Sequence, residues 1–372
     1  MAKRILITGG AGFVGSHLAD ELLRLGHEVR VFDNLAPQVH ERGLPEYLAG
    51  EVNFVPGELR DLDAVRDAVR NVDVIYHFGA AVGVGQSMYE IAHYMGVNTQ
   101  GTANVLQAML DLGNKVEKLV VASSMSIYGE GRYLCVACGE VTPDERSQEQ
   151  LKCKRWEPLC PQCGRDLAPI PTDETKPLNV SSYYALSKKD QEEMVLLYGR
   201  TYGTPAVALR FFNIYGVRQA LSNPYTGVAA IFASQLLNER APLVFEDGKQ
   251  MRDFVSVHDI VDACVSAMDR EEANGMALNV GSGEAVSVTE VAQALSSALG
   301  MEIEPELTEK YRAGDVRHCF ADISKAKNVL GYVPKVKFTE GVRKLAEWLR
   351  DQRADDRVAE AVQKLTVHGL TA

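Results

Sequence analysis

The chain has 372 residues, of which 46% are hydrophobic and 24% are charged, a balance typical of a folded globular protein rather than a disordered one. Lysine and arginine total 39 against 50 acidic residues, so the net charge of −11 argues against nucleic-acid binding driven by phosphate neutralisation. The amino terminus lacks a signal-peptide pattern, and no apolar run reaches the roughly eighteen residues that span a bilayer. We therefore expect a cytoplasmic protein without a membrane segment, whose seven cysteines are not structural disulfides.

Short apolar runs alternate with segments of helical periodicity along the chain. Two such helical segments occupy residues 16–26 and 97–113. The apolar runs predict strands at residues 4–9, 28–33, 72–80, 117–124, 206–213 and 277–283. Strands that alternate with helices in this way predict an α/β fold built on a doubly wound parallel sheet.

The first predicted strand runs into a glycine-rich turn that opens a helix. Gly9, Gly12 and Gly15 lie at this turn, in the sequence ILITGGAGFVGSHL. Glycines allow the tight turn and let a pyrophosphate approach the helix N-terminus, where free N–H groups favour an anion. A glycine turn that merely packs is the alternative, but the flanking strand and helix favour a dinucleotide site.

The second predicted strand ends at an acidic residue, Asp33. A carboxylate in this place accepts hydrogen bonds from a ribose diol and repels a 2′-phosphate. The next residues, Asn34 and Leu35, provide no arginine that would reverse this preference. The sequence therefore favours NAD over NADP as the cofactor.

Tyr184 and Lys188 are four residues apart in a segment of helical pattern, so they share one face of a helix. An ammonium beside a phenol lowers the phenol's pKa from its ordinary value of about 10, which would let Tyr184 exchange protons near neutral pH. This spacing is common on helix surfaces, so by itself it does not indicate a catalytic site; further motifs are needed.

Two CxxC pairs, Cys135 with Cys138 and Cys160 with Cys163, are separated by 21 residues, and each pair is followed by glycine. Four thiolates on two tight turns provide the tetrahedral ligand set that zinc prefers. We therefore predict a structural zinc ion, which leaves no open coordination position for catalysis; a redox dithiol pair or inert cysteines are the alternatives.

Several motifs in order resemble the extended short-chain dehydrogenase/reductase family, and within it the nucleotide-sugar epimerases and dehydratases. They are GGAGFVG at residues 9–15, HFGAA at 77–81, SSMSIYG at 123–129, YALSK at 184–188 and LRFFNIYG at 209–216. The resemblance covers nearly the whole chain outside the cysteine-containing insert. It implies a Rossmann core, NAD as cofactor, a nucleotide-diphosphate sugar as substrate and a homodimer formed through the tyrosine-bearing helix.

The resemblance also implies roles for individual residues. Ser124 would bond the substrate hydroxyl, Tyr184 would act as general acid and base, and Lys188 would tune Tyr184 and hold the nicotinamide ribose. The implied cofactor-binding residues are Gly9, Gly12, Phe13, Val14, Gly15, Asp33, Asn34, Glu58, Leu59, Phe78, Ala80, Asn98, Tyr184 and Lys188. The implied substrate-binding residues are Val82, Ser124, Ser126, Asn213, Arg252, Arg312 and Asp315, with the arginines and Asn213 directed to the diphosphate.

The residues after Ser124 distinguish between reactions within the family. Members that eliminate water carry an Asp-Glu pair there, and members that decarboxylate keep the glutamate, whereas this chain has Met125 and Ser126. The resemblance thus implies a dTDP- or UDP-hexose 4-epimerase that works through a transient 4-keto intermediate. The alternatives are a dehydrogenase or reductase on the same substrates and a non-catalytic NAD-sensing protein.

These motifs divide the chain into four parts. We expect an NAD-binding Rossmann core over residues 1–130 and 171–213 with the strand 277–283, and a zinc-ribbon-like insert over 131–170. A smaller, discontinuous nucleotide-sugar lobe would occupy 214–276 and 284–350, followed by a tail over 351–372 that carries no functional motif. Because the insert interrupts a loop near the site, we expect it to cap or narrow the sugar pocket or to extend a subunit contact.

Overall fold

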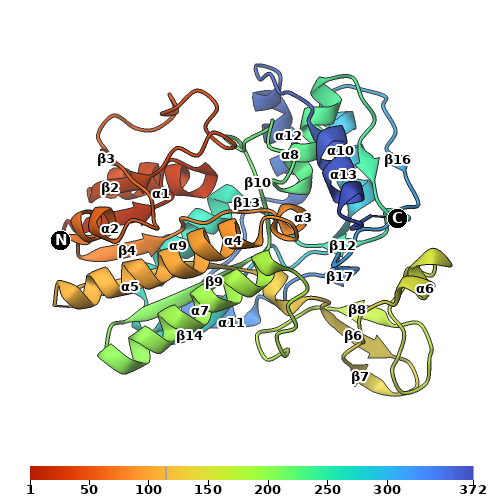
Figure 1. The fold of residues 1–372 in the computed structure, drawn as a ribbon, viewed down its shortest axis with the longest axis horizontal. Helices are drawn as coiled ribbons and strands as arrows, with labels where there is room; N and C mark the ends of the chain where they lie inside the picture. The colour runs from red at the N-terminus through yellow and green to blue at the C-terminus, as the bar shows by residue number, and fades with distance from the viewer. Residues whose placement is uncertain (114, 372) are drawn as a thin grey trace.

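The computed structural model describes residues 1–113 and 115–371. All six predicted apolar runs form strands of one parallel sheet, which has seven strands in total. The strand order is β14-β9-β5-β4-β1-β2-β3 (Figure 1). The strands are β1 (Arg4–Thr8), β2 (Glu28–Asp33), β3 (Asn53–Pro56), β4 (Val74–His77), β5 (Lys118–Ser124), β9 (Ala206–Phe211) and β14 (Met276–Val280). The predicted α/β fold with a doubly wound sheet is confirmed, and the order reverses beside β1, where such sheets bind ligands.

Helices cover both faces of this sheet. On one face lie α2 (Leu62–Val69), α5 (Gly101–Asp111) and α7 (Tyr183–Tyr202), and on the other lie α1 (Phe13–Arg24), α9 (Val257–Asp269) and α11 (Ser324–Leu330). Each set packs against buried strand side chains in its own hydrophobic cluster. Both α9 and α11 belong to the residue ranges predicted for the smaller lobe, but both pack on the central sheet, so these parts of the predicted lobe belong to the core.

The smaller lobe packs three helices, α8 (Val228–Leu237), α10 (Val288–Ala298) and α12 (Phe338–Leu349), around a cluster of their own. Its short strand pairs are β10 (Asn213–Tyr215) with β13 (Phe254–Ser256) and β11 (Leu243–Val244) with β16 (Glu306–Leu307). A three-stranded group contains β15 (Val286–Ser287), β12 (Met251–Arg252) and β17 (His318–Cys319). The last helix, α13 (Val358–Val367), follows the irregular residues 351–357.

Short helical segments fill the connections at the carboxyl edge of the sheet. They are α3 (Val84–Ser87), α4 (Ile91–Tyr94), the π-helix η1 (Met95–Gln100) and the 3-10 segment η2 (Met125–Tyr128). A further 3-10 segment, η3 (Glu271–Ala273), lies at the opposite edge, between α9 and the start of β14.

The cysteine-containing insert forms a small unit that projects beside the smaller lobe (Figure 1). It consists of the antiparallel strands β6 (Arg132–Cys135), β7 (Gly139–Val141) and β8 (Ala168–Ile170) and the short helix α6 (Gln148–Lys152). Within the described part of the chain, none of the helices combines the length and the apolar character needed to cross a membrane.

Candidate active site

A cavity of about 640 Å³ opens at the carboxyl edge of the sheet and continues into the smaller lobe. This volume lies within the range of about 300–1,000 Å³ that is usual for ligand sites. Every residue predicted to bind cofactor or substrate lines this one cavity, with the exception of Asn98. Side chains spread over the whole sequence therefore converge on one place.

The glycine turn after β1 forms one end of the cavity. Gly9 has a φ of +68°, and a Cβ there would lie 2.8 Å from the Gly79 Cα. A Cβ on Gly15 would lie 2.5 Å from the Gly9 carbonyl oxygen. Because the backbone at the start of α1 is this closely packed and free of side chains, the turn fits the pyrophosphate of a dinucleotide.

Asp33 lies buried beside this turn, and its carboxylate is oriented by the backbone. It accepts hydrogen bonds from the Ala11 N–H at 3.1 Å and from the Leu35 N–H at 2.9 Å. Each carboxylate oxygen keeps a further acceptor position, which suits a ribose diol. Glu58 lies nearby, where it accepts a hydrogen bond from the Asn34 side chain at 3.1 Å.

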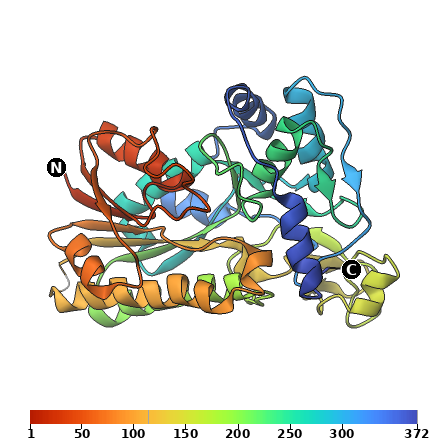
Figure 2. The same cartoon turned by 45° about the horizontal axis from the view of Figure 1, so that its top comes forward.

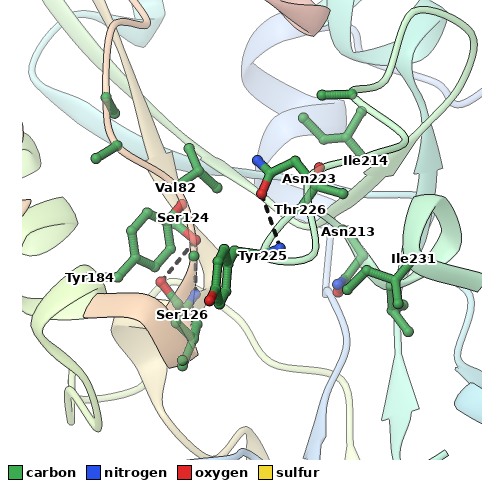
Figure 3. Close-up of a pocket in the computed structure, with 18 of the residues that line it drawn as sticks. Val82, Ser124, Ser126, Tyr184, Asn213, Ile214, Asn223, Tyr225, Thr226 and Ile231 are labelled. Atoms are coloured by element: carbon green, nitrogen blue, oxygen red, sulfur yellow. Dashed lines mark hydrogen bonds between the residues drawn. The ribbon is translucent and has the colours of Figure 1, made fainter. Parts of the chain in front are cut away.

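The predicted catalytic residues meet where β5 ends and α7 begins, as Figure 3 shows for Ser124, Ser126 and Tyr184. Ser126 donates its hydroxyl and its N–H to Ser124 Oγ, at 2.9 and 3.2 Å. Tyr184 lies beside Ser124 in the same view, and this serine hydroxyl lowers the pKa of the phenol. Since Ser124 Oγ already accepts two hydrogen bonds, its own proton is free to point at the phenol oxygen.

The pKa values of Tyr184 and Lys188 are set by burial. Burial raises the pKa of Tyr184 to about 12, although the neighbouring Ser124 hydroxyl opposes the rise. Burial also lowers the pKa of Lys188 to about 7. Lys188 directs its Nζ to the Ala122 carbonyl at 2.9 Å. Desolvation is thus the dominant influence on both groups in this structure, and Ser124 rather than Lys188 is the neighbour that lowers the pKa of Tyr184.

Asn98 lies behind the cavity wall rather than in it. Its side chain accepts a hydrogen bond from the Ala81 N–H at 2.7 Å and donates to the Ala81 carbonyl at 3.0 Å and to Ser187 Oγ at 2.8 Å. It thus joins the loop after β4 to α7 next to Lys188, and it holds the wall instead of contacting a ligand directly.

The sugar side of the cavity contains buried acceptors without a partner. Among the described residues, Asn213 Oδ1, Gln219 Oε1 and Gln250 Oε1 have no hydrogen-bond partner, and all three side chains line the cavity. Buried acceptors in this state favour a ligand that carries hydroxyl donors. The sequence analysis missed Gln250, although it stands two residues before Arg252 in the segment that carries the phosphate motif.

The two predicted phosphate-binding arginines line the cavity but have partners within the protein. Arg252 donates to the carbonyls of Met251 and Arg317 at 2.9 and 2.8 Å, and it also bonds the Val316 carbonyl. Arg312 pairs with Asp315 at 2.7 Å. Asp315 is thus the counter-ion of Arg312 in this structure.

The segment predicted as a tail without a functional motif is part of the cavity wall. From α13 and the residues after it, Val358, Ala361, Val362, Leu365 and Leu370 line the cavity. Figure 2 shows this helix crossing the molecule toward the insert. Its placement depends on partners distant in sequence: a Cβ on Gly85 would lie 3.3 Å from Leu365, and His368 stacks on Tyr89 with a ring separation of 4.9 Å.

The four predicted zinc ligands come together in the insert. The Sγ atoms of Cys135, Cys138, Cys160 and Cys163 all lie within 4.8 Å of one another. Zinc binds thiolates at about 2.3 Å, which places the sulfur atoms of a tetrahedral site about 3.8 Å apart. The donor set therefore fits zinc in both chemistry and spacing, whereas Cys153 is exposed and lies outside the cluster.

Known proteins with the same arrangement identify the family. Residues 5–157 match the NAD-dependent epimerase/dehydratase family, and residues 166–345 match the GDP-mannose 4,6-dehydratase description. A dTDP-L-rhamnose 4-epimerase of Burkholderia thailandensis is 32% identical over 94% of this chain and 96% of the relative. A UDP-N-acetyl-α-D-glucosaminuronate decarboxylase of Bacillus cytotoxicus is also 32% identical, over 95% of this chain and 100% of the relative. The crystal structure of a Thermus thermophilus UDP-glucose 4-epimerase in complex with NAD is 32% identical, covers 94% of this chain and 99% of its own, and has a TM-score of 0.73. The chain therefore belongs to the NAD-dependent epimerase/dehydratase family of enzymes, as its motifs predict.

The tight turn at Gly15 leads to a first prediction. In Gly15→Ala, the new methyl group would overlap the Gly9 carbonyl, so we expect a loss of about 1–3 kcal/mol in the free energy of unfolding, measured in urea. Gly50→Ala is the matched control, because a Cβ there meets nothing within 4 Å. Equal stability of the two variants would contradict the close packing of this turn.

Proposed function

We propose that this protein is an NAD-dependent nucleotide-sugar 4-epimerase that acts on a dTDP- or UDP-hexose through a transient 4-keto intermediate. The observation that carries the proposal is the placement of Ser124 and Tyr184 beside each other, in the same cavity as the dinucleotide turn and the unpaired acceptors. The names of two of the three relatives described above support epimerisation over net oxidation.

In this mechanism Tyr184 moves the proton of the sugar 4-hydroxyl. Bound NAD, which the glycine turn and Asp33 would hold, would supply the hydride acceptor. Its positive charge would oppose the rise that burial imposes on the pKa of Tyr184. Ser124 holds the substrate hydroxyl, Tyr184 takes its proton while hydride leaves the same carbon, and the steps reverse on the other face of the keto sugar.

The residues after Ser124 support epimerisation rather than elimination of water or carbon dioxide. Met125 packs against the hydrophobic core of the sheet, and Ser126 donates its hydroxyl to Ser124. Neither side chain is the carboxyl group that dehydrating and decarboxylating relatives would carry at these places. The site therefore has groups for proton transfer at the carbon that is oxidised, but no second carboxyl group for elimination at a neighbouring carbon.

The arginines would bind the substrate's diphosphate. Arg252 and Arg312 line the cavity together with Asn213, and arginine binds phosphate oxygens through parallel hydrogen bonds. A diphosphate would compete with Asp315 for the guanidinium of Arg312. The unpaired acceptors of Asn213 and Gln219 would then accept hydrogen bonds from sugar hydroxyls.

The apolar face of α13 would exclude water from this cavity. Its lining residues carry no polar side-chain group, and Leu365 is buried against the loop that holds α3. A closed, water-poor site strengthens the polar interactions inside it and keeps a keto sugar from escaping before the hydride returns.

The role of Tyr184 gives a second prediction. In Tyr184→Phe the proton acceptor is lost, so we expect kcat for inversion of a UDP- or dTDP-hexose to fall by about 10²- to 10⁴-fold, as measured by NMR without added cofactor. Tyr183→Phe is the matched control, because this neighbouring tyrosine of α7 is exposed. If Tyr184→Phe turns over its sugar at the parent rate, the mechanism is refuted. If the parent protein releases stoichiometric NADH, the protein is a dehydrogenase instead.

The apolar wall gives a third prediction. Leu365→Asp places a carboxylate against the cavity, and we expect kcat/KM for the sugar nucleotide to fall about tenfold or more. Val367→Asp, on the outer side of the same helix, should match the parent, because Val367 is 76% exposed. If both variants keep the parent kcat/KM, α13 has no part in the site.

We further propose that the four clustered cysteines hold a structural zinc ion and that the protein works as a cytoplasmic homodimer. Reduced thiolates suit the cytoplasm. The resemblance implies a dimer formed through the tyrosine-bearing helix and its neighbour, and exposed Leu110 on α5 and Leu197 on α7 support such a contact. Zinc in a closed set of four sulfurs would stabilise the insert and take no part in the hydride step.

The zinc proposal gives a fourth prediction. In the double variant Cys160→Ser, Cys163→Ser, we expect about one equivalent of zinc per chain to be lost, because half of the ligand set is gone, as measured by atomic emission. Cys153→Ser should retain the metal, since this thiol lies outside the cluster. A parent protein that contains no zinc after expression in zinc-supplied cells would refute the proposal.

A further inference from the structure

The insert meets the smaller lobe directly behind the cavity wall formed by residues 312–316. No residue of 131–170 lines the cavity, so the expectation that the insert caps or narrows the sugar pocket is wrong in this structure. Instead, the insert contacts residues immediately before, within and after the wall segment. These contacts are a buried ion-pair network, a hydrogen bond to the backbone and a small hydrophobic cluster.

The ion-pair network is centred on Arg317, whose side chain is fully buried. Its guanidinium donates to Glu157 of the insert at 2.6 and 3.0 Å, to Glu246 at 2.9 Å and to Asp247 at 2.6 Å. Burial raises the pKa of Glu157, but hydrogen bonds from His318 and Arg317 outweigh this effect and hold it at about 2. A buried arginine needs such partners, because an uncompensated charge in the interior is strongly destabilising.

A second residue of the insert reaches the wall segment itself. Arg146, with 4% of its side chain exposed, donates to the Asp315 carbonyl at 3.0 Å and to Glu246 at 2.8 Å. On the other side of the segment, Leu151 and Trp156 of the insert pack with Tyr311 in a hydrophobic cluster. The insert therefore holds both ends of the segment and its middle.

The wall segment depends on these contacts because it has little structure of its own. Residues 313–317 form neither helix nor strand. Their backbone is held from the lobe by Arg252, which donates to the Arg317 carbonyl, and from the C-terminal segment by the Leu370 carbonyl, which accepts from the Ala313 N–H at 2.8 Å. From the core, Ser181 donates to the Gly314 carbonyl at 2.9 Å. Arg146 provides the corresponding hydrogen bond from the insert.

The insert in turn has a very small core, which includes two of the clustered cysteines. Tyr133, Cys135, Val141, Cys160 and Leu167 are its buried hydrophobic residues. Glu157 lies in an irregular segment three residues before Cys160. A metal ion bound at Cys160 would therefore fix the chain next to Glu157 and supply stability that so small a core does not.

We propose that the metal-ordered insert is a brace that sets the position of residues 312–316 for the substrate's nucleoside diphosphate, with Arg146 and Glu157 as its positioning residues. This inference rests on the proposed function, since it assigns the same cavity to a nucleotide sugar. The brace acts on Arg312 and Asp315 through their backbone, so it affects binding of the nucleotide and leaves the chemistry at Tyr184 unchanged.

The test measures nucleotide binding and turnover separately, in the full-length, zinc-loaded protein. For Glu157→Gln and for Arg146→Met, we expect the Kd of UDP and dTDP, measured by calorimetry, and the KM of the sugar nucleotide to rise about tenfold. We expect kcat to remain within about twofold of the parent. Asp166→Asn is the matched control within the insert, because Asp166 forms an exposed pair with Arg155 and should leave all three values unchanged.

The outcomes separate the brace from a merely structural role and from failure of the proposed function. If either variant lowers the melting temperature while the Kd of both nucleotides stays within twofold of the parent, the brace is refuted. Removal of zinc from the parent with a chelator provides a second arm that needs no substitution, and an unchanged Kd there would also refute the proposal. If the parent binds UDP or dTDP and the variants weaken it, but no hexose is inverted, the brace stands and the proposed reaction fails.

Discussion

Ser124 at the end of β5 lies beside Tyr184 in the first turn of α7, and buried hydrogen bonds hold these two elements in register. Lys188 donates to the Ala122 carbonyl, two residues before Ser124. One turn further along α7, Glu192 accepts a hydrogen bond from Ser123 at 2.6 Å and forms a buried ion pair with Arg210 of β9. A buried pair of this kind adds little net stability against an apolar substitute, and here it ties α7 directly to β9 while Ser123 ties it to β5. Since a proton transfer needs its donor and acceptor within hydrogen-bond reach, register is the property that this site requires.

The sequence predicts the sheet and the catalytic residues because their signals are local. Strands in the interior of a parallel sheet are continuous apolar runs, and the run at residues 117–124 becomes the fully buried β5. The edge strand β3 was missed because only one of its faces needs apolar residues, and its sequence NFVP has no such run. Likewise, the spacing of the four cysteines encodes the cluster directly, since each pair occupies one tight turn.

Other parts of the site depend on contacts between residues far apart in the chain, which a single sequence does not display. The pKa of Tyr184 is raised by burial, and burial follows from the packing of the closed cavity rather than from the spacing to Lys188. The pairing of Arg312 with Asp315 needs the turn between them, and the placement of α13 needs Gly85 and Tyr89 as partners. In amphipathic pattern α13 resembles any surface helix, so nothing in residues 358–367 distinguishes a cavity wall from an ordinary packed face.

The insert and the C-terminal segment differ in sequence and structure, yet both form hydrogen bonds with the same irregular stretch, residues 313–315. Arg146 donates to the carbonyl of Asp315, the Leu370 carbonyl accepts from the N–H of Ala313, and Ser181, just before α7, donates to the Gly314 carbonyl at 2.9 Å. Residues 313–315 are therefore held from three sides. None of these hydrogen bonds comes from a strand of the central sheet, which positions only the residues at the carboxyl ends of its strands. The predicted catalytic residues lie at the end of β5 and in α7, whereas the added segments contact the smaller lobe. Added segments can therefore alter the nucleotide-binding wall without changing how α7 packs on β5. The cysteine cluster lies outside the cavity, in the same insert as Arg146 and Glu157. A metal ion bound there would stiffen the peptide that carries these two residues, which a metal ion among the reacting groups would not do.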